Sequence, residues 1–167
     1  LHLLHEAAVA GFAVPTPLRD NLLGYAKAQL QRTDAEELAT RCYAAHVLAL
    51  HGQPQPAALA RLAAEVRQPQ AWVTPECTLH LAAAWLAAGD PALAAALVPE
   101  GIAPRAGRSD GGDCGSGARD RAVALLALIG LDAQQPTALR LARELAEPQG
   151  WHSTQDTAWA LLALGRW

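Results

Sequence analysis

The sequence predicts an all-α protein in which helical hairpins form a ring, an α/α toroid. Of its 167 residues, 39 are Ala and 27 are Leu, two of the strongest helix formers. Val, Ile and Thr together number only 17, too few to supply the β-branched faces of a sheet. Glycines and prolines also recur at a spacing of about forty residues, which indicates a repeated supersecondary unit.

The repeat consists of an Ala- and Leu-rich segment, a glycine and a proline-led restart. The glycines lie at positions 11, 52, 89, 130 and 165. A glycine just past a helix and a proline in the first turn of the next helix are typical boundary signals. Thr16 and Asp90 precede prolines as capping residues, and capping boxes are predicted at residues 33–36 and 153–156.

Two kinds of helix alternate along the chain. The expected helices span residues 3–10, 17–31, 36–50, 56–66, 75–88, 91–97, 118–129, 136–146 and 154–164. Helices that end at the glycines are apolar nearly all round, which predicts burial on both sides, whereas those between them are amphipathic. This pattern predicts four and a half hairpins of one toroid domain over residues 1–167, with a Gly-, Pro- and Asp-rich surface loop at about 98–117.

The inner helices of such a ring all run in the same direction, so their N-termini gather at one end. Residues around Thr40, Thr74, Ser116 and Ser153 are therefore expected to be neighbours. Several helix dipoles would point toward this end, which makes it the place to look for chemistry.

Two Cys/His pairs on successive inner helices are candidate metal ligands. Cys42 lies four residues before His46, and Cys77 three residues before His80. Four such side chains could hold a tetrahedral zinc ion. Because free cysteines are usually buried, and core histidines usually find a backbone partner, the favoured interpretation is structural, with no metal or cofactor.

Three further groups of polar residues suggest a functional site, but each also has a structural explanation. His152, Ser153 and Asp156 offer hydrolase side chains, but consecutive residues at a helix start do not converge, and a capping box explains them. Residues 109–115 contain two aspartates and several glycines without a calcium-loop pattern, which favours a solvated turn. Residues 119–121, Arg-Asp-Arg, predict ion pairs at the end of the ring rather than only a charged first turn.

Charge and hydropathy exclude other function classes. The net charge is −3, and the basic residues are scattered, so nucleic acid is not expected as a partner. The longest apolar stretch, residues 122–131, is about half of a membrane span, so this chain is not expected to insert into a bilayer.

The chain has no Met and no leader pattern, and we interpret it as part of a longer protein. Three cysteines imply no disulfide framework.

Three segments resemble a known family. Residues 150–164, Gly-Trp-His-Ser-Thr-Gln-Asp-Thr followed by an Ala/Leu helix, resemble a segment of the thioester domains of alpha-2-macroglobulins and complement proteins. Residues 114–122, Cys-Gly-Ser-Gly-Ala-Arg-Asp-Arg-Ala, resemble an element of the bacterial alpha-2-macroglobulins, as do residues 2–15. The family-motif residues, expected to be structural, are Gly115, Ser116, Arg119, Asp120, Trp151, Ser153, Thr154, Gln155 and Asp156.

The resemblance implies a six-hairpin toroid inside a large, complement-like endopeptidase inhibitor. In that family a protease cuts a bait segment, and a Cys-x-x-Gln thioester then acylates the attacker. No cysteine here begins that motif, so this chain is expected to be neither an enzyme nor covalently reactive. The implied partners are target proteases and the other domains of the parent chain. The implied location is periplasmic or at the cell envelope, often as a lipoprotein. The apolar helix at residues 3–10 is expected to lack its covering hairpin.

Two alternatives stay open. Terpene cyclases and prenyltransferases share the toroid, and a tryptophan-lined ring would suit a carbocation. However, the sequence has neither an Asp-x-Asp-Asp proton donor nor a recognisable Asp companion for a Cys/His zinc site. A helical-repeat protein-binding module without covalent chemistry is the second alternative.

Overall fold

A computed structural model describes residues 1–34, 37–68, 70, 72–99, 102, 115–132, 136–147 and 151–167. Every regular element in these residues is a helix, which confirms the predicted all-α class. The helices are α1 (His2–Val9), α2 (Thr16–Leu30), α3 (Leu38–Leu50), α4 (Pro56–Glu65), α5 (Pro75–Ala87), α6 (Pro91–Ala95), α7 (Gly117–Asp132), α8 (Pro136–Ala146) and α9 (Thr154–Arg166).

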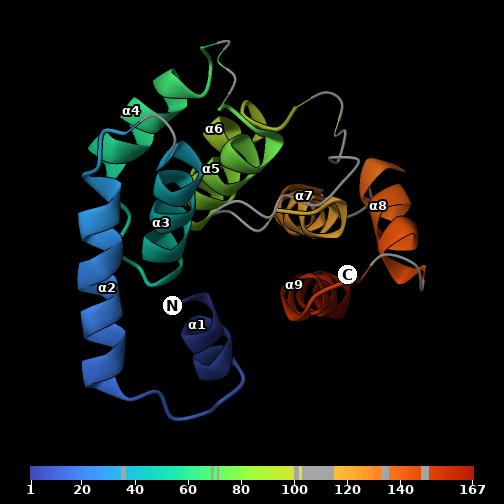
Figure 1. The fold of residues 1–167 in the computed structure, drawn as a ribbon, viewed down its shortest axis with the longest axis horizontal. Coiled ribbons are helices and arrows are strands. Elements are labelled where there is room, and N and C mark those ends of the chain that lie inside the picture. The colour runs from blue at the N-terminus through green and yellow to red at the C-terminus, as the bar shows by residue number, and fades with distance from the viewer. Residues whose placement is uncertain are drawn as a thin grey trace.

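The odd-numbered helices form an inner layer and the even-numbered helices an outer one (Figure 1). Along the inner layer, α3 packs against α5, α5 against α7, and α7 against α9. From outside, α2 covers α3, α4 and α6 cover α5, and α8 covers α7. This alternation is the α/α toroid that the two helix types predict.

The inner helices are parallel, as the ring predicts. The start of α5 contacts the start of α7 through Glu76 and Arg119, and the start of α7 contacts that of α9 through Ser116 and Asp156. At the opposite end, Glu6 of α1 pairs with Arg166 of α9. The N-terminal ends of the inner helices therefore lie together at one end of the ring, and their C-terminal ends lie together at the other.

The core divides into two clusters of buried side chains. One cluster lies between α2, α3, α4 and α5, and the other lies between α5, α7, α8 and α9. Helix α5 faces both, since Leu81 belongs to the first cluster and Leu79 to the second. Tyr43 and Val98 pack against both clusters and join them.

The glycine repeat marks real helix ends at three of its five positions. Gly11, Gly52 and Gly89 have φ values of 84°, 69° and 89°, the left-handed conformation that ends a helix. The prediction was wrong for Gly130 and Gly165, which lie inside α7 and α9. Gly130 instead lies beside Leu86 of α5, because a Cβ at this position would come within 2.1 Å of Leu86 Cδ2 and would make that side chain shift.

The capping predictions had mixed outcomes. Asp90 Oδ1 accepts a 3.0 Å hydrogen bond from Leu93 N and caps α6 as predicted. Thr16 does not cap α2, since the helix already includes Thr16 and begins after Pro15. The capping box at residues 33–36 and most of the loop at 98–117 fall on residues 35–36, 100–101 and 103–114, which lie outside the described residues.

Helix α1 departs from the expected burial of inner helices. No residue of α1 is fully buried, although the His2 side chain keeps only 11% of its surface exposed. Leu3 is 78% exposed. The reason is that α1 packs against α3, whereas its contacts with α9 include the ion pair of Glu6 with Arg166 but no extensive packing (Figure 1). The expectation of an uncovered apolar edge at this helix is confirmed.

Candidate functional site

The N-terminal end of the inner ring gathers a set of buried polar side chains, which is the candidate functional site. Asp156, only 1% exposed, lies at its centre. Ser116 Oγ donates a 2.5 Å hydrogen bond to Asp156 Oδ1, and His152 N donates to Oδ2 at 3.3 Å. This one carboxylate therefore ties the segment before α7 to the start of α9.

The two serines of this network also cap their helices. Ser153 Oγ accepts a 3.0 Å hydrogen bond from Asp156 N, which confirms the predicted cap of α9. Ser116 Oγ accepts from Arg119 N at 3.1 Å at the start of α7. Because both hydroxyls are engaged in capping, the hydrolase alternative for His152, Ser153 and Asp156 gains no support from their geometry.

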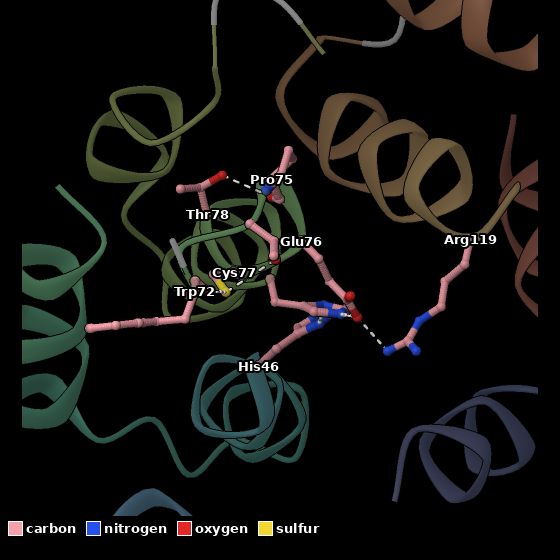
Figure 2. Close-up of polar contacts among 9 residues, drawn as sticks. His46, Trp72, Pro75, Glu76, Cys77, Thr78 and Arg119 are labelled. Carbon is pink, nitrogen blue, oxygen red and sulfur yellow. Dashed lines mark hydrogen bonds and ion pairs between the residues drawn. The ribbon is translucent and has the colours of Figure 1, made fainter. Parts of the chain in front are cut away.

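A buried ion pair connects α5 to α7. Arg119 Nη2 donates to Glu76 Oε1, and both side chains are nearly fully buried (Figure 2). The Arg119 guanidinium also lies 6.0 Å from the ring centre of Trp159 on α9. On the other side of Glu76, His80 Nε2 lies 3.5 Å from Oε1. The pair thus links three successive inner helices.

Arg119 and Arg121 form ion pairs, as predicted for this charged turn. Besides Arg119, Arg121 Nε donates a 2.8 Å hydrogen bond to Glu144 on the outer helix α8. Arg121 and Arg140 both bond Glu144, and they lower the pKa of this carboxyl. Asp120 is buried, with 2% of its surface exposed. The structural interpretation of this charged turn is confirmed.

A stack of imidazole and aromatic rings lines the inside of the ring. His46 Nδ1 and His80 Nδ1 lie 3.3 Å apart, and the His2 ring centre lies 5.4 Å from that of His46. Trp159 and Tyr43 complete the stack, at 5.2 Å from His2 and 4.8 Å from His80. Four inner helices, α1, α3, α5 and α9, contribute to this stack.

Burial sets the protonation of the stack. It lowers the pKa of His46 well below the ordinary value, and the neighbouring imidazoles His80 and His2 act in the same direction. It also lowers the pKa of His2 to about 4, although the nearby Glu6 carboxylate opposes the shift. These two rings are therefore neutral at pH 7.

Two of the candidate metal ligands come together across the α3–α5 interface. His46 Nδ1 lies 3.3 Å from His80 Nδ1, and Cys42 and Cys77 belong to the same cluster of buried residues, so the predicted facing of α3 and α5 is correct. Among the residues that the structure describes, no group of three or more His, Cys, Asp or Glu side chains is arranged to hold a metal ion. The zinc hypothesis therefore gains no support.

The remaining family-motif residues lie at the rim of the site. Trp151 Nε1 donates a 3.2 Å hydrogen bond to Leu145 O and holds the entry to α9 against α8. Gly115 is buried, Gln155 is half-buried and Thr154 is exposed. Trp151 and Thr154 belong to the wall of a shallow depression at the start of α9.

A second hollow lies between α1, α3 and α9. It has a volume of about 300 Å³ and a mainly apolar lining that includes Leu3, Leu162 and Trp159. It exists because α1 leaves a gap between itself and α9.

Sequence reasoning missed Glu76, His2 and Tyr43. Glu76 is the one Asp, Glu, Lys or Arg in α5 and stands in its first turn, and this isolated charge was an available signal for a buried partner. His2 and Tyr43 carried no such signal, because their roles depend on how α1 and α3 face α9. Residues 109–114, with the calcium alternative and Cys114, lie outside the described residues.

Fold and site together define an α/α toroid domain whose successive hairpins are joined by buried polar contacts. No family model matches the sequence, and no curated protein matches it. Among solved structures, the chain is similar to native Escherichia coli alpha-2-macroglobulin, with 26% identity and a TM-score of 0.75. The match covers 98% of this chain and 11% of that protein, so the chain spans about a tenth of its length. In the described part of the chain, no helix has the length and hydropathy that crossing a membrane requires.

Proposed function

We propose that this chain is part of the thioester-type domain of a bacterial alpha-2-macroglobulin-like inhibitor that traps attacking proteases. The observation that carries the proposal is the match to E. coli alpha-2-macroglobulin over 98% of the chain. The buried contacts of Ser116, Arg119 and Asp156 support it, because the segments that resemble the family are the ones that join the hairpins.

The chain contributes a scaffold rather than a reactive group. Cys42, Cys77 and Cys114 are followed by Tyr-Ala-Ala, Thr-Leu-His and Gly-Ser-Gly, so none begins a Cys-x-x-Gln motif. A thioester, where the parent has one, belongs to another part of the domain. The ring would hold that part in place, and the chain itself would catalyse nothing. Its partners would be the other domains of the parent and, through them, the trapped protease at the cell envelope.

The test uses the longer polypeptide that contains this chain, incubated with trypsin. We expect trypsin to cut the polypeptide once in a segment outside the toroid and then to elute with it in gel filtration. The trapped trypsin should still hydrolyse a small peptide amide but should lose most of its activity on a large protein substrate. Prior treatment with methylamine is the control, because only a thioester-dependent trap is weakened by it.

Two outcomes would overturn the proposal. Digestion of the polypeptide to fragments, with trypsin fully active on the large substrate, would contradict trapping. Binding of intact trypsin without cleavage, and without protection of the large substrate, would instead support a helical-repeat binding module.

A further inference from the structure

Five of the six histidines of the chain gather where α1 packs against the ring. His2 of α1 faces His46 of α3 edge to face, with the ring centres 5.4 Å apart. Further along α1, His5 faces His51 at the end of α3 in the same way, at 5.6 Å. His80 of α5 lies behind His46, with the two Nδ1 atoms 3.3 Å apart. Two imidazole pairs therefore cross one interface, that between α1 and α3.

The charged groups around these imidazoles are already paired with each other. Glu6 Oε1 lies 3.4 Å from His2 Nε2, but the other oxygen of this carboxylate pairs with Arg166 of α9 at 2.5 Å. Behind the imidazole stack, Glu76 of α5 pairs with Arg119 of α7. The other titratable or aromatic groups here are Tyr43, Trp159 and the amino-terminal residue Leu1, whose carbonyl oxygen lies 3.2 Å from His51 Nε2. Because each carboxylate has an arginine partner, every proton added to the imidazoles makes the cluster more positive.

The packed position of α1 disfavours protonation. Burial lowers the pKa of His2 to about 4. Burial also lowers the pKa of His5, assisted by the His51 ring and opposed by Glu6, and it lowers the pKa of His46. Once α1 leaves the ring, water surrounds its two imidazoles, and their pKa returns toward the ordinary value of 6.5. The released form therefore binds more protons, so falling pH favours release.

Helix α1 is also the part of the inner layer that can move alone. None of its residues is fully buried, and it packs far less extensively against α3 than α5 does. The remaining inner helices are joined by extensive packing and by polar contacts without imidazoles, such as those of Glu76 with Arg119 and of Ser116 with Asp156. Protonation at the α1–α3 interface would leave these contacts in place.

We propose that α1 is a pH-sensitive element, in which proton uptake by His2 and His5 releases residues 2–9 while the rest of the ring stays folded. Release removes Leu3 from the wall of the hollow between α1, α3 and α9, which opens the hollow and uncovers Trp159. His2 alone, with a pKa of about 4 when packed and 6.5 when released, shifts the equilibrium about twentyfold toward release between pH 7 and 5. His5 acts in the same direction.

The imidazoles are treated as proton acceptors rather than metal ligands. In the described part of the chain, no three or more His, Cys, Asp or Glu side chains are arranged to hold a metal ion. The experiment nevertheless contains a metal chelator, so that only protons compete for the imidazole nitrogens.

The experiment follows the 15N- and 13C-labelled chain of 167 residues by NMR from pH 7.5 to pH 4. We expect residues 2–9 to lose their helical chemical shifts and become mobile on the nanosecond timescale. The midpoint should lie between the two pKa values of His2, 6.5 and about 4. Residues of α5 and α7 should keep helical shifts over the same range, and raising the pH should restore α1.

Two variants identify the responsible groups. The His2→Gln/His5→Gln double variant should lower the midpoint by at least about 0.5 pH unit, because neither glutamine binds a proton. His152→Gln is the matched control, since this imidazole is exposed and precedes α9 instead of belonging to the α1–α3 interface. It should leave the midpoint unchanged.

Three results would overturn the proposal. One is an α1 that keeps its helical shifts down to pH 4, another is a loss of helical shifts in α1 and α5 at the same pH, and the third is an equal midpoint in the wild-type chain and the double variant. Where the double variant has already released α1 at pH 7, the single His5→Gln variant takes its place. None of these readouts involves a protease, so this proposal and the proposed function fail independently.

Discussion

Asp156 shows at the scale of one residue how a family motif stabilises the ring. Its carboxylate accepts hydrogen bonds from Ser116 and His152 at almost full burial. We predict that Asp156→Asn lowers the free energy of unfolding by about 1–3 kcal/mol. The substitution replaces one of the two acceptor oxygens with an NH2 group, and this donor would face another donor. Urea denaturation measures this change.

The matched control for this prediction is Asp20→Asn. Asp20 pairs with Arg19 at 3.0 Å, but both side chains are well exposed, so the loss should stay below about 0.5 kcal/mol. Equal unfolding midpoints for the two variants would show that the Ser116–Asp156 bond is not formed as described.

The imidazole stack makes stability depend on pH. The folded state lowers the pKa of His2 from 6.5 to about 4, mainly because the ring is buried. Between these values the unfolded chain binds more protons, so stability falls as pH falls from about 7 toward about 4. We expect His2 alone to account for about 2 kcal/mol between pH 7 and 5. His46 adds to the loss, because its pKa is also lowered.

His2→Gln provides the test, since glutamine does not titrate. The variant should show a shallower loss of stability over this pH range than the wild-type chain, measured by urea denaturation at each pH. Superimposable pH profiles for the two proteins would contradict the burial of His2.

At the scale of the element, α1 should be the least stable helix of the inner layer. None of its residues is fully buried. Glu6 and Arg166, 2.5 Å apart, make an ion pair whose Arg166 side chain is 41% exposed. We predict that backbone amides of residues 6–9 exchange with deuterium at least about a hundredfold faster than those in the middle of α5. Exchange followed by mass spectrometry measures the ratio, and equal protection would mean that α1 is packed as firmly as α5.

Element boundaries were largely predictable from local signals. Prolines and polar caps are local, so the starts at Pro56, Pro75 and Pro136 agree with the predicted ones. Gly130 was misassigned because its role depends on Leu86, a side chain from another hairpin. No local signal distinguishes a glycine that ends a helix from a glycine that leaves room for a side chain of another helix.

The candidate site was predictable only in part, for the same reason. The motif residues Ser116, Arg119 and Asp156 were found through resemblance, but Glu76 and His2 were not. Their partners lie on other helices, Arg119 for Glu76 and Trp159 for His2, so both pairings depend on how the helices pack against one another.

At the scale of the whole molecule, apolar side chains are exposed on α1 and just after it, at the edge of the ring formed by the first helix of the chain. Leu3, Val9 and Phe12 are 78%, 69% and 70% exposed. Patches of this kind seldom stay uncovered, so we predict that the chain binds an apolar dye and self-associates at high concentration. The Leu3→Gln/Phe12→Ser double variant should reduce both effects, measured by dye fluorescence and sedimentation. A monomer that binds no dye would show that this edge is covered in solution.

Side chains from successive hairpins join the parallel inner helices into a ring. A double-mutant cycle on Glu76→Gln and Arg119→Met tests it most directly, because 43 residues separate the two partners in sequence. We predict a coupling free energy of about 2 kcal/mol or more in urea denaturation, since the pair is buried. A parallel cycle on the exposed Arg19 and Asp20 should give less than about 0.5 kcal/mol. Additive effects of the two buried substitutions, within about 0.5 kcal/mol, would contradict the ring.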